Sequence, residues 1–255
     1  MPPAKSEAPA DGDRCATGVE GLDSILSGGI PRGNTVLVTG SVGTGKTSLS
    51  VEFLLHGARG GENSLYVSVT ESSEKLIQNL VRYDYFEPRL VKEGRLIFID
   101  LPLIYHRLGL EKAEFDTQDV AILIKVIVDL VREMRTKRLV IDSVTSVCYR
   151  LKDPEKIRQF ILDLGTALSG LGCTTLLVSE ISPTADRYSL FGVEEAIADG
   201  IVIMSNYERR GDLLRTLQVV KMRGTTHSRA KYVLDLTPVG VLLVPLLKGG
   251  SVSAG

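Results

Sequence analysis

The chain has 255 residues, of which 44% are hydrophobic and 24% are charged, and its 30 Lys and Arg against 31 Asp and Glu give a formal net charge of −1. This composition is typical of one large globular α/β domain, and it excludes a protein whose whole surface attracts polyanions, although a local basic patch could remain. The three cysteines, Cys15, Cys148 and Cys173, form no CxxC pair, which argues against a structural zinc site and favours free thiols in a reducing compartment.

The two ends of the chain differ from its middle. Residues 1–14 and 248–255 are small, polar or charged without an apolar period, so we expect flexible tails around one domain over 15–247. The first residues lack the apolar segment of a signal peptide, and no apolar stretch is long enough to span a bilayer. These observations predict a cytoplasmic protein with no membrane partner.

Short apolar runs alternate with helical segments through much of this domain. The runs that we expect to form strands are residues 35–39, 64–69, 95–100, 139–142 and 174–178. Such continuous runs are typical of strands buried on both faces. Their alternation with helices indicates an α/β fold, a doubly wound and mostly parallel sheet with helices on both faces.

Two of the intervening segments carry apolar residues at helical spacing. They cover residues 120–134 and 157–171, and we expect both to be helices that face the core. The second also has Asp153 as an N-cap, Pro154 at its first helical position and Gly172 just beyond its end.

Beyond Gly200 the pattern changes to consecutive short strands separated by turn residues. The expected strands cover residues 201–204, 213–222, 232–236 and 241–244. Strands that follow one another without helices favour antiparallel pairing, so we expect an antiparallel C-terminal extension of the same sheet.

The run Gly40-Ser41-Val42-Gly43-Thr44-Gly45-Lys46-Thr47 fits the phosphate-binding pattern GxxxxGK[ST], between an expected strand and an expected helix over 48–58. In such a P-loop, backbone N–H groups surround the β-phosphate, the lysine reaches the β- and γ-phosphates, and the Thr47 hydroxyl coordinates Mg²⁺. The sequence therefore predicts nucleotide binding from Gly40 to Ser48. We expect Lys46 to face solvent when no nucleotide is bound.

Two aspartates end expected strands and compete for the role of metal-holding acid. Asp142 closes the run Leu139–Ile141, at the carboxyl end of a buried strand, where open α/β sheets bind ligands. We predict that it holds Mg²⁺ opposite Thr47. Asp100 ends another strand in the same way, but the long amphipathic helix before the Asp142 strand and the serine after Asp142 favour Asp142.

Glu71 follows the second expected strand and is our candidate general base. Hydrolysis of ATP needs a carboxylate that orients the attacking water, because phosphoryl transfer depends mainly on positioning. The alternative interpretation is an acid at the start of the helix that begins near Ser73, where it would complement the helix dipole. Glu180, at the end of the fifth strand, is the next candidate.

Residues 205–231 contain seven Lys or Arg and two acids, a local excess of positive charge. Within this region Lys221 and Arg223, which we call the basic pair, lie on one face of a strand that turns at Gly224. This arrangement could present positive charge to a phosphate, and we expect it to project from the sheet edge towards a neighbouring subunit's nucleotide. The alternative is a solvated edge.

Taken together, the motifs resemble the KaiC circadian-clock ATPases, within the RecA/RadA-like group of P-loop proteins. The resemblance covers nearly all of the folded part and rests on residues 17–23, 28–33, the P-loop, the strand into Glu71, 139–143, 192–195 and 221–227. It implies a RecA-like ATPase that binds ATP and Mg²⁺ and forms a homo-oligomeric ring, commonly a hexamer, with nucleotide between subunits. The family's K-x-R-G-T-[ST]-H stretch, which reaches the adjacent subunit's nucleotide, is matched here by Lys221, Met222, Arg223, Thr225 and His227.

Two departures from the family pattern limit what the resemblance implies. The family often has two adjacent glutamates where this chain has Thr70 and Glu71, so hydrolysis could be slow. The clock proteins carry two such domains, and neither clock timing nor autophosphorylation follows from one.

Two other functions remain open. A RadA-like recombinase would bind DNA through loops, for which residues 149–152 and 182–191 are the candidates, but the chain has no Trp and few aromatic residues for stacking on bases. An ATP-dependent assembly module with little hydrolysis would fit the missing glutamate. The sequence names neither the partner nor the process.

Overall fold

The computed structural model describes residues 13–109, 114–182, 187–209 and 211–246. Most of both predicted tails lies outside these residues, but Arg14, at the end of the predicted N-terminal tail, belongs to a small two-stranded sheet of β1 (Arg14–Cys15) and β2 (Ile30–Pro31). Among the described residues, no helix has the length and apolar character needed to cross a membrane.

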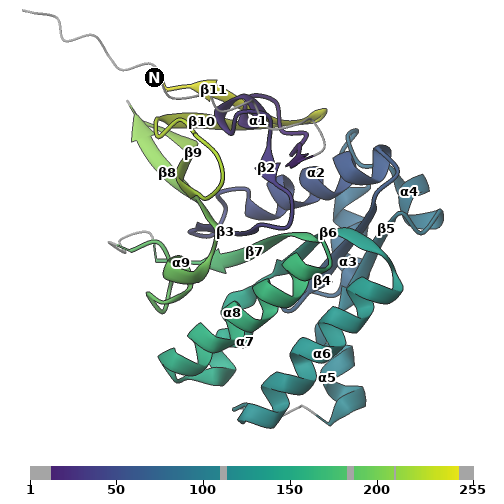
Figure 1. The fold of residues 1–255 in the computed structure, drawn as a ribbon. Coiled ribbons are helices and arrows are strands. Elements are labelled where there is room, and N and C mark those ends of the chain that lie inside the picture. The colour runs from purple at the N-terminus through teal and green to yellow at the C-terminus, as the bar shows by residue number, and fades with distance from the viewer. Residues whose placement is uncertain (1–12, 110–113, 183–186, 210, 247–255) are drawn as a thin grey trace, which may run out of the picture.

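The main sheet has nine strands in the order β11-β10-β9-β8-β3-β7-β6-β4-β5 (Figure 1). Its strands are β3 (Thr35–Gly40), β4 (Asn63–Ser68), β5 (Leu96–Asp100), β6 (Thr136–Asp142), β7 (Thr174–Glu180), β8 (Gly200–Arg209), β9 (Asp212–Met222), β10 (Lys231–Thr237) and β11 (Gly240–Pro245). Neighbours from β5 to β8 are parallel, and those from β8 to β11 are antiparallel. The mostly parallel sheet and its antiparallel C-terminal extension are therefore confirmed.

Helices cover both faces of the parallel part of the sheet. The helices of the described residues, including those outside this part of the sheet, are α1 (Leu22–Ile25), α2 (Lys46–Arg59), α3 (Ser73–Leu80), α4 (Pro88–Lys92), α5 (Leu101–Leu108), α6 (Thr117–Glu133), α7 (Val144–Leu151), α8 (Pro154–Gly170) and α9 (Glu194–Ile197). The predicted core-facing helices correspond to α6 and α8. Helix α8 begins as expected, because the Asp153 side chain accepts a hydrogen bond from the backbone N–H of Glu155 at 2.8 Å.

The core is divided in two by the sheet, because alternate residues of each buried strand point to opposite faces. On β3, Val36 and Val38 pack in the cluster that contains α2, whereas Leu37 packs in the cluster that contains α6, α7 and α8. All six residues of β3 are buried. The strand that carries the P-loop is thus enclosed from both sides.

The first and last parts of the described chain meet beside α2 (Figure 1). Glu20 forms a β-bridge with Leu242, and its carbonyl accepts a hydrogen bond from the N–H of Leu243 at 3.0 Å. Leu236 on β10 lies so close to Gly45 that a Cβ there would be 3.3 Å from its methyl group. The antiparallel extension therefore packs against the helix that follows the P-loop.

One predicted DNA-binding loop is wrong. Tyr149 and Leu151 are in helix α7, and the Arg150 guanidinium between them lies 4.7 Å from the ring centroid of Tyr105 and 5.2 Å from that of Phe115. The apolar residues at positions 144, 147, 148 and 151 of α7 are buried at helical spacing, which explains why this segment is a helix. Part of the other candidate loop, residues 183–186, lies outside the described residues.

Candidate functional site

A cavity of about 340 Å³ opens at the carboxyl ends of β3, β6 and β7. Its lining residues come from the P-loop, the ends of two parallel strands and the extension: Val42, Gly43, Gly45, Lys46, Thr47, Asp142, Glu180 and Leu236. This is the edge at which open parallel sheets bind ligands. The predicted phosphate-binding and metal-binding residues are therefore brought together in one cavity.

The P-loop has the backbone shape that its glycines predict. Gly43 and Gly45 have φ angles of +78° and +96°, in the left-handed region that favours glycine, and nothing lies within 4 Å of a Cβ built on Gly43. The loop is closed internally, because the Thr44 hydroxyl donates to the carbonyl of Ser41 at 2.9 Å. Val42, at the outer turn of the loop, is 80% exposed.

Helix α2 begins at Lys46, earlier than predicted, so Lys46, Thr47 and Ser48 form its first turn. The first N–H groups of a helix have no acceptor within the helix, so this turn offers the donors that bind phosphate at a helix N-terminus.

The expectation that Lys46 faces solvent is wrong. Its residue is only 8% exposed, and its Nζ donates to the carbonyls of Gly40 and Ser41, each at 2.9 Å. Burial lowers the pKa of Lys46 below its usual range, while the carboxylates of Glu180 and Asp142 act in the opposite direction. The loop itself therefore holds the lysine beside the cavity.

Asp142 lies where a metal-holding acid is expected. Its Oδ2 accepts a hydrogen bond from the Thr47 hydroxyl at 2.9 Å and another from the Tyr66 hydroxyl at 2.6 Å. Mg²⁺ prefers oxygen ligands and usually takes only one or two carboxylates together with water and phosphate oxygens. The pair of Thr47 and Asp142 fits that preference, and no cluster of three or more possible His, Cys, Asp or Glu ligands occurs in the described part of the chain.

Of the other three candidate carboxylates, Glu180 lines the cavity, whereas Glu71 and Asp100 are not among its lining residues. Glu180, at the end of β7, lines the cavity, whereas Glu71 is half-buried in the segment after β4 and forms an ion pair with Lys75 at 3.4 Å. Asp100 accepts a hydrogen bond from the backbone N–H of Ser73 at 2.6 Å, at the start of α3. Asp100 therefore caps a helix and does not compete with Asp142.

Sequence reasoning missed three residues that contact this site. Tyr66 bonds to Asp142, Leu236 covers Gly45, and the Arg215 Nε donates to the carbonyl of Gly43 at 3.0 Å. A tyrosine inside an otherwise buried strand was a usable signal for Tyr66, because a buried phenol normally needs a hydrogen-bond partner. For Arg215 and Leu236 the sequence contains no comparable signal.

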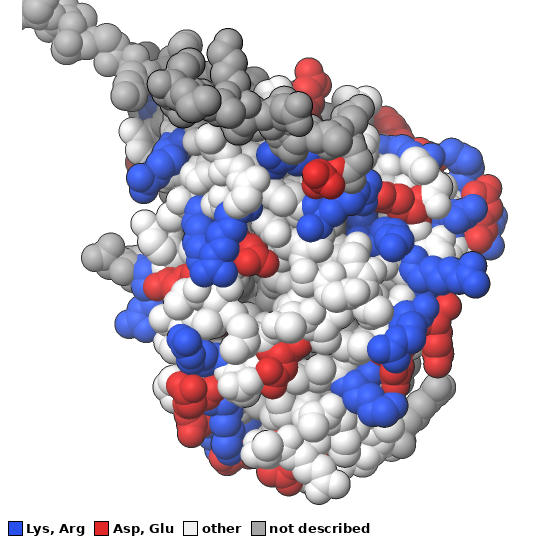
Figure 2. All heavy atoms as spheres, viewed as in Figure 1, with Lys and Arg blue, Asp and Glu red and all other residues white. Residues whose placement is uncertain are grey.

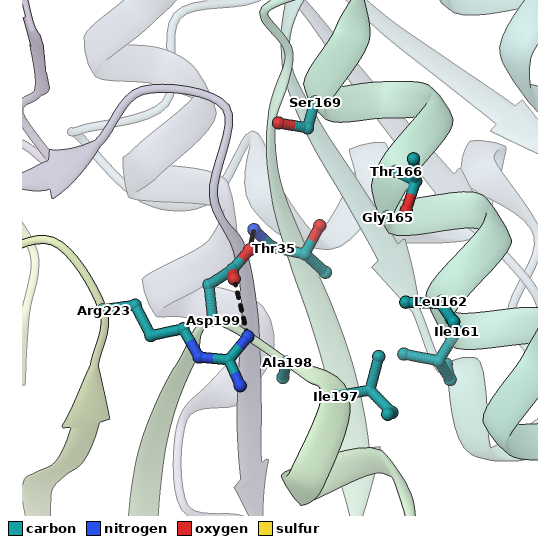
Figure 3. A pocket seen from close by; sticks show the side chains of 10 residues that line it. All are labelled: Thr35, Ile161, Leu162, Gly165, Thr166, Ser169, Ile197, Ala198, Asp199 and Arg223. Carbon is teal, nitrogen blue, oxygen red and sulfur yellow. Dashed lines mark hydrogen bonds and ion pairs between the residues drawn. The ribbon is translucent and has the colours of Figure 1, made fainter.

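The basic pair lies at the other end of β3 from the P-loop. Lys221 Nζ donates to the carbonyl of Ala198 at 2.6 Å, and the Arg223 guanidinium pairs with Asp199 at 3.3 Å (Figure 3). Asp199 also accepts a hydrogen bond from the N–H of Thr35, the first residue of β3. The length of β3, roughly 16 Å, therefore separates the pair from its own P-loop.

Arg223 borders a cavity of about 320 Å³ whose opposite wall is helix α8 (Figure 3). The Arg223 side chain is 57% exposed. Lys221 is half-buried, and burial together with the repulsion of Arg223 lowers its pKa, an effect that Asp199 opposes.

The remaining residues of this stretch have different environments. Met222 is 5% exposed and packs in the core against Gly200, so its side chain faces away from the basic pair. The Thr225 hydroxyl donates to the carbonyl of Leu26 at 3.2 Å, and His227 is half-buried in the same turn. The nucleotide contact of Met222 stays a prediction, and its buried side chain leaves only its backbone for such a contact.

Comparison with known proteins agrees with this geometry. A family model described as "ATPase: KaiC" matches residues 15–248. The chain belongs to the KaiC family. Among its relatives, the UPF0273 protein of Thermotoga maritima is 38% identical over 235 residues, which is 91% of this chain and 96% of the relative.

Other members of the KaiC family extend the comparison. The circadian clock oscillator protein KaiC of Nostoc sp. is 34% identical over 92% of this chain, but the match covers only 44% of that relative. The crystal structure of a KaiC-like protein from the hyperthermophilic archaeon Pyrococcus horikoshii aligns with a TM-score of 0.77 and 33% identity, over 91% of this chain and 99% of the other. The RecA-like fold and membership of a family of P-loop ATPases, both predicted from the sequence, are therefore confirmed.

Proposed function

We propose that the protein binds ATP with Mg²⁺ at the end of β3 and hydrolyses it at the interfaces of a homo-oligomeric ring, and that hydrolysis is coupled to a partner protein or process. The observation that carries this proposal is the distance between the P-loop and the basic pair. Thr47, Asp142 and Lys46 line one cavity, whereas Lys221 and Arg223 lie at the other end of β3. A head-to-tail contact between subunits would bring the basic pair of one subunit against the P-loop cavity of the next.

In this proposal each residue has a separate task. The P-loop N–H groups and Lys46 bind the β- and γ-phosphates, and Thr47 and Asp142 hold Mg²⁺. Mg²⁺ would supply charge neutralisation on the phosphate oxygens. Glu71 orients the attacking water, with Glu180 as the second candidate because it lines the cavity. Arg223 and Lys221 stabilise the negative charge of the neighbouring subunit's transition state.

Two alternatives are separated by the same experiment. An assembly module with little hydrolysis is favoured by Thr70 in place of the second glutamate. The DNA-binding alternative is weakened by the helical position of Tyr149–Leu151. On the face seen in Figure 2, Lys and Arg are interspersed with Asp and Glu and form no continuous basic band.

The test combines phosphate release with size-exclusion chromatography, each with and without ATP and single-stranded DNA. We expect ATP to move the protein to a ring-sized species that releases phosphate, with no stimulation by DNA. ATP-dependent assembly without phosphate release would support the assembly module instead. A monomer that hydrolyses ATP as fast as the assembled protein would refute a catalytic site shared between subunits.

A further inference from the structure

A tyrosine that no motif includes lies against the proposed metal site. Tyr66 is on β4, next to β6 in the sheet, and it pairs in register with Val140, two residues before Asp142. Its residue is 2% exposed, and its hydroxyl donates to Asp142 Oδ2 at 2.6 Å. The same oxygen accepts the Thr47 hydroxyl at 2.9 Å.

Packing alone does not explain a tyrosine at this position, because phenylalanine would supply the same aromatic ring. Tyr66 packs in the apolar cluster that contains α2, and its ring lies 5.4 Å from that of Phe98, centroid to centroid. A hydroxyl buried there is costly unless it is hydrogen-bonded, so its bond to Asp142 needs an explanation beyond packing. The Tyr66 hydroxyl is the donor of this bond, and the Asp142 carboxylate oxygen accepts it.

The two donors to Asp142 come from different kinds of structure. Thr47 belongs to the first turn of α2, and its oxygen is itself a proposed metal ligand. Tyr66 lies in the buried part of β4, residues 64–68, and is not among the residues that line the cavity. Among the described residues, hydrogen bonds to the Asp142 carboxylate reach Oδ2 only, so Oδ1 is not engaged by them.

We propose that Tyr66 is a positioning residue for Asp142, and that it fixes the carboxylate in the orientation that holds Mg²⁺ beside the nucleotide. This inference rests on the proposed Mg²⁺–ATP function. Outer hydrogen-bond partners of metal-holding groups typically change metal affinity 10–100-fold when they are removed. Tyr66 should therefore affect metal affinity strongly and metal-free nucleotide binding weakly.

The experiment uses Tyr66→Phe, which removes one oxygen atom and keeps the ring. The Mg²⁺ dependence of binding is measured with a fluorescent ADP analogue, first in excess EDTA and then in a Mg²⁺ titration. We expect the Mg²⁺ midpoint to rise about 10–100-fold, while the affinity in EDTA stays within about twofold of wild type. The matched control is Tyr105→Phe, because Tyr105 is equally buried but its hydroxyl has no hydrogen-bond partner among the described residues.

A second comparison separates positioning from a general loss of stability. In an Asp142→Ala background, Tyr66→Phe should cause no further rise in the Mg²⁺ midpoint, because the residue through which it acts is gone. The inference is overturned if Tyr66→Phe keeps the wild-type midpoint, if it weakens binding equally in EDTA, or if its effect persists without Asp142. If the affinity of the wild-type protein for the ADP analogue does not change with Mg²⁺ concentration, the proposed metal site itself is refuted.

Discussion

Mixing two inactive variants tests whether the basic pair acts between subunits. Lys46→Ala supplies an intact Arg223 but a pocket that binds and orients the γ-phosphate poorly, whereas Arg223→Ala supplies an intact pocket without the arginine. If Arg223 serves the neighbouring subunit, each variant alone is inactive and the mixture recovers part of the activity. Recovery follows because some interfaces then combine an intact pocket with an intact arginine.

The structure allows the size of the effect to be worked out. In the isolated subunit Arg223 pairs with Asp199 at 3.3 Å, and more than half of its side chain is exposed. Such exposed pairs are worth about 0–1 kcal/mol, so releasing the guanidinium costs little. An arginine delivered to a neighbour's phosphate increases the rate by about 10³–10⁵, which corresponds to about 4–7 kcal/mol. The gain therefore exceeds the cost of leaving Asp199.

The assay is phosphate release at saturating ATP over a series of mixing ratios. In a one-to-one mixture that assembles at random, about a quarter of the interfaces pair an intact pocket with an intact arginine, so we expect up to about a quarter of the wild-type rate. Mass photometry on tagged subunits checks that mixed assemblies form. Full turnover by Arg223→Ala alone, or a silent mixture in which mixed assemblies are present, would refute action in trans.

Four further tests use single variants or changed conditions. Lys46→Ala should weaken ATP binding by roughly 100-fold, because charge-assisted hydrogen bonds are worth about 1.5–3 kcal/mol each. Calorimetry measures the affinity, and the melting temperature checks that the variant is folded. Unchanged binding by a variant with an unchanged melting temperature would contradict the P-loop assignment. Glu71→Gln should lower turnover by about 10²-fold with nearly normal ATP binding, and a normal rate together with an inactive Glu180→Gln would transfer the role to Glu180. All three thiols are buried, and burial raises the pKa of Cys173 to about 12, so a thiol reagent at pH 8 should label none in the folded protein and three after unfolding. The thiols ionise near pH 9 in the unfolded chain, whereas burial raises their pKa in the folded protein. Ionisation therefore stabilises the unfolded chain, and the free energy of unfolding should fall as the pH rises above 9. Denaturant titrations at pH 8 and pH 10 would detect this fall.

The strands and the long helices could be predicted because their signals are local. Continuous apolar runs located β3 to β7, and helical spacing located α6 and α8. Helices of four or five residues, such as α1 and α9, have too few positions to show a period. Helix α7 does carry the helical pattern, which the interpretation of residues 149–152 as a DNA-binding loop overlooked.

Contacts within the site were harder to predict, because they depend on strand order. Nothing near Tyr66 in the sequence indicates that β4 lies beside β6, and only that neighbourhood brings its hydroxyl to Asp142. The error on Lys46 has a different cause. The prediction considered the phosphate as the partner of the ammonium group and overlooked the backbone carbonyls of Gly40 and Ser41.

The meeting of the two chain ends beside α2 has a consequence for the order in which the site forms. The P-loop is among the first parts of the domain to leave the ribosome, but Leu236 and Leu243, which pack near its helix and against Glu20, are among the last. Contacts between residues so distant in sequence close late in folding. A nascent chain that ends before β10 therefore carries the complete phosphate-binding motif without Leu236, the residue that covers Gly45 in the folded domain.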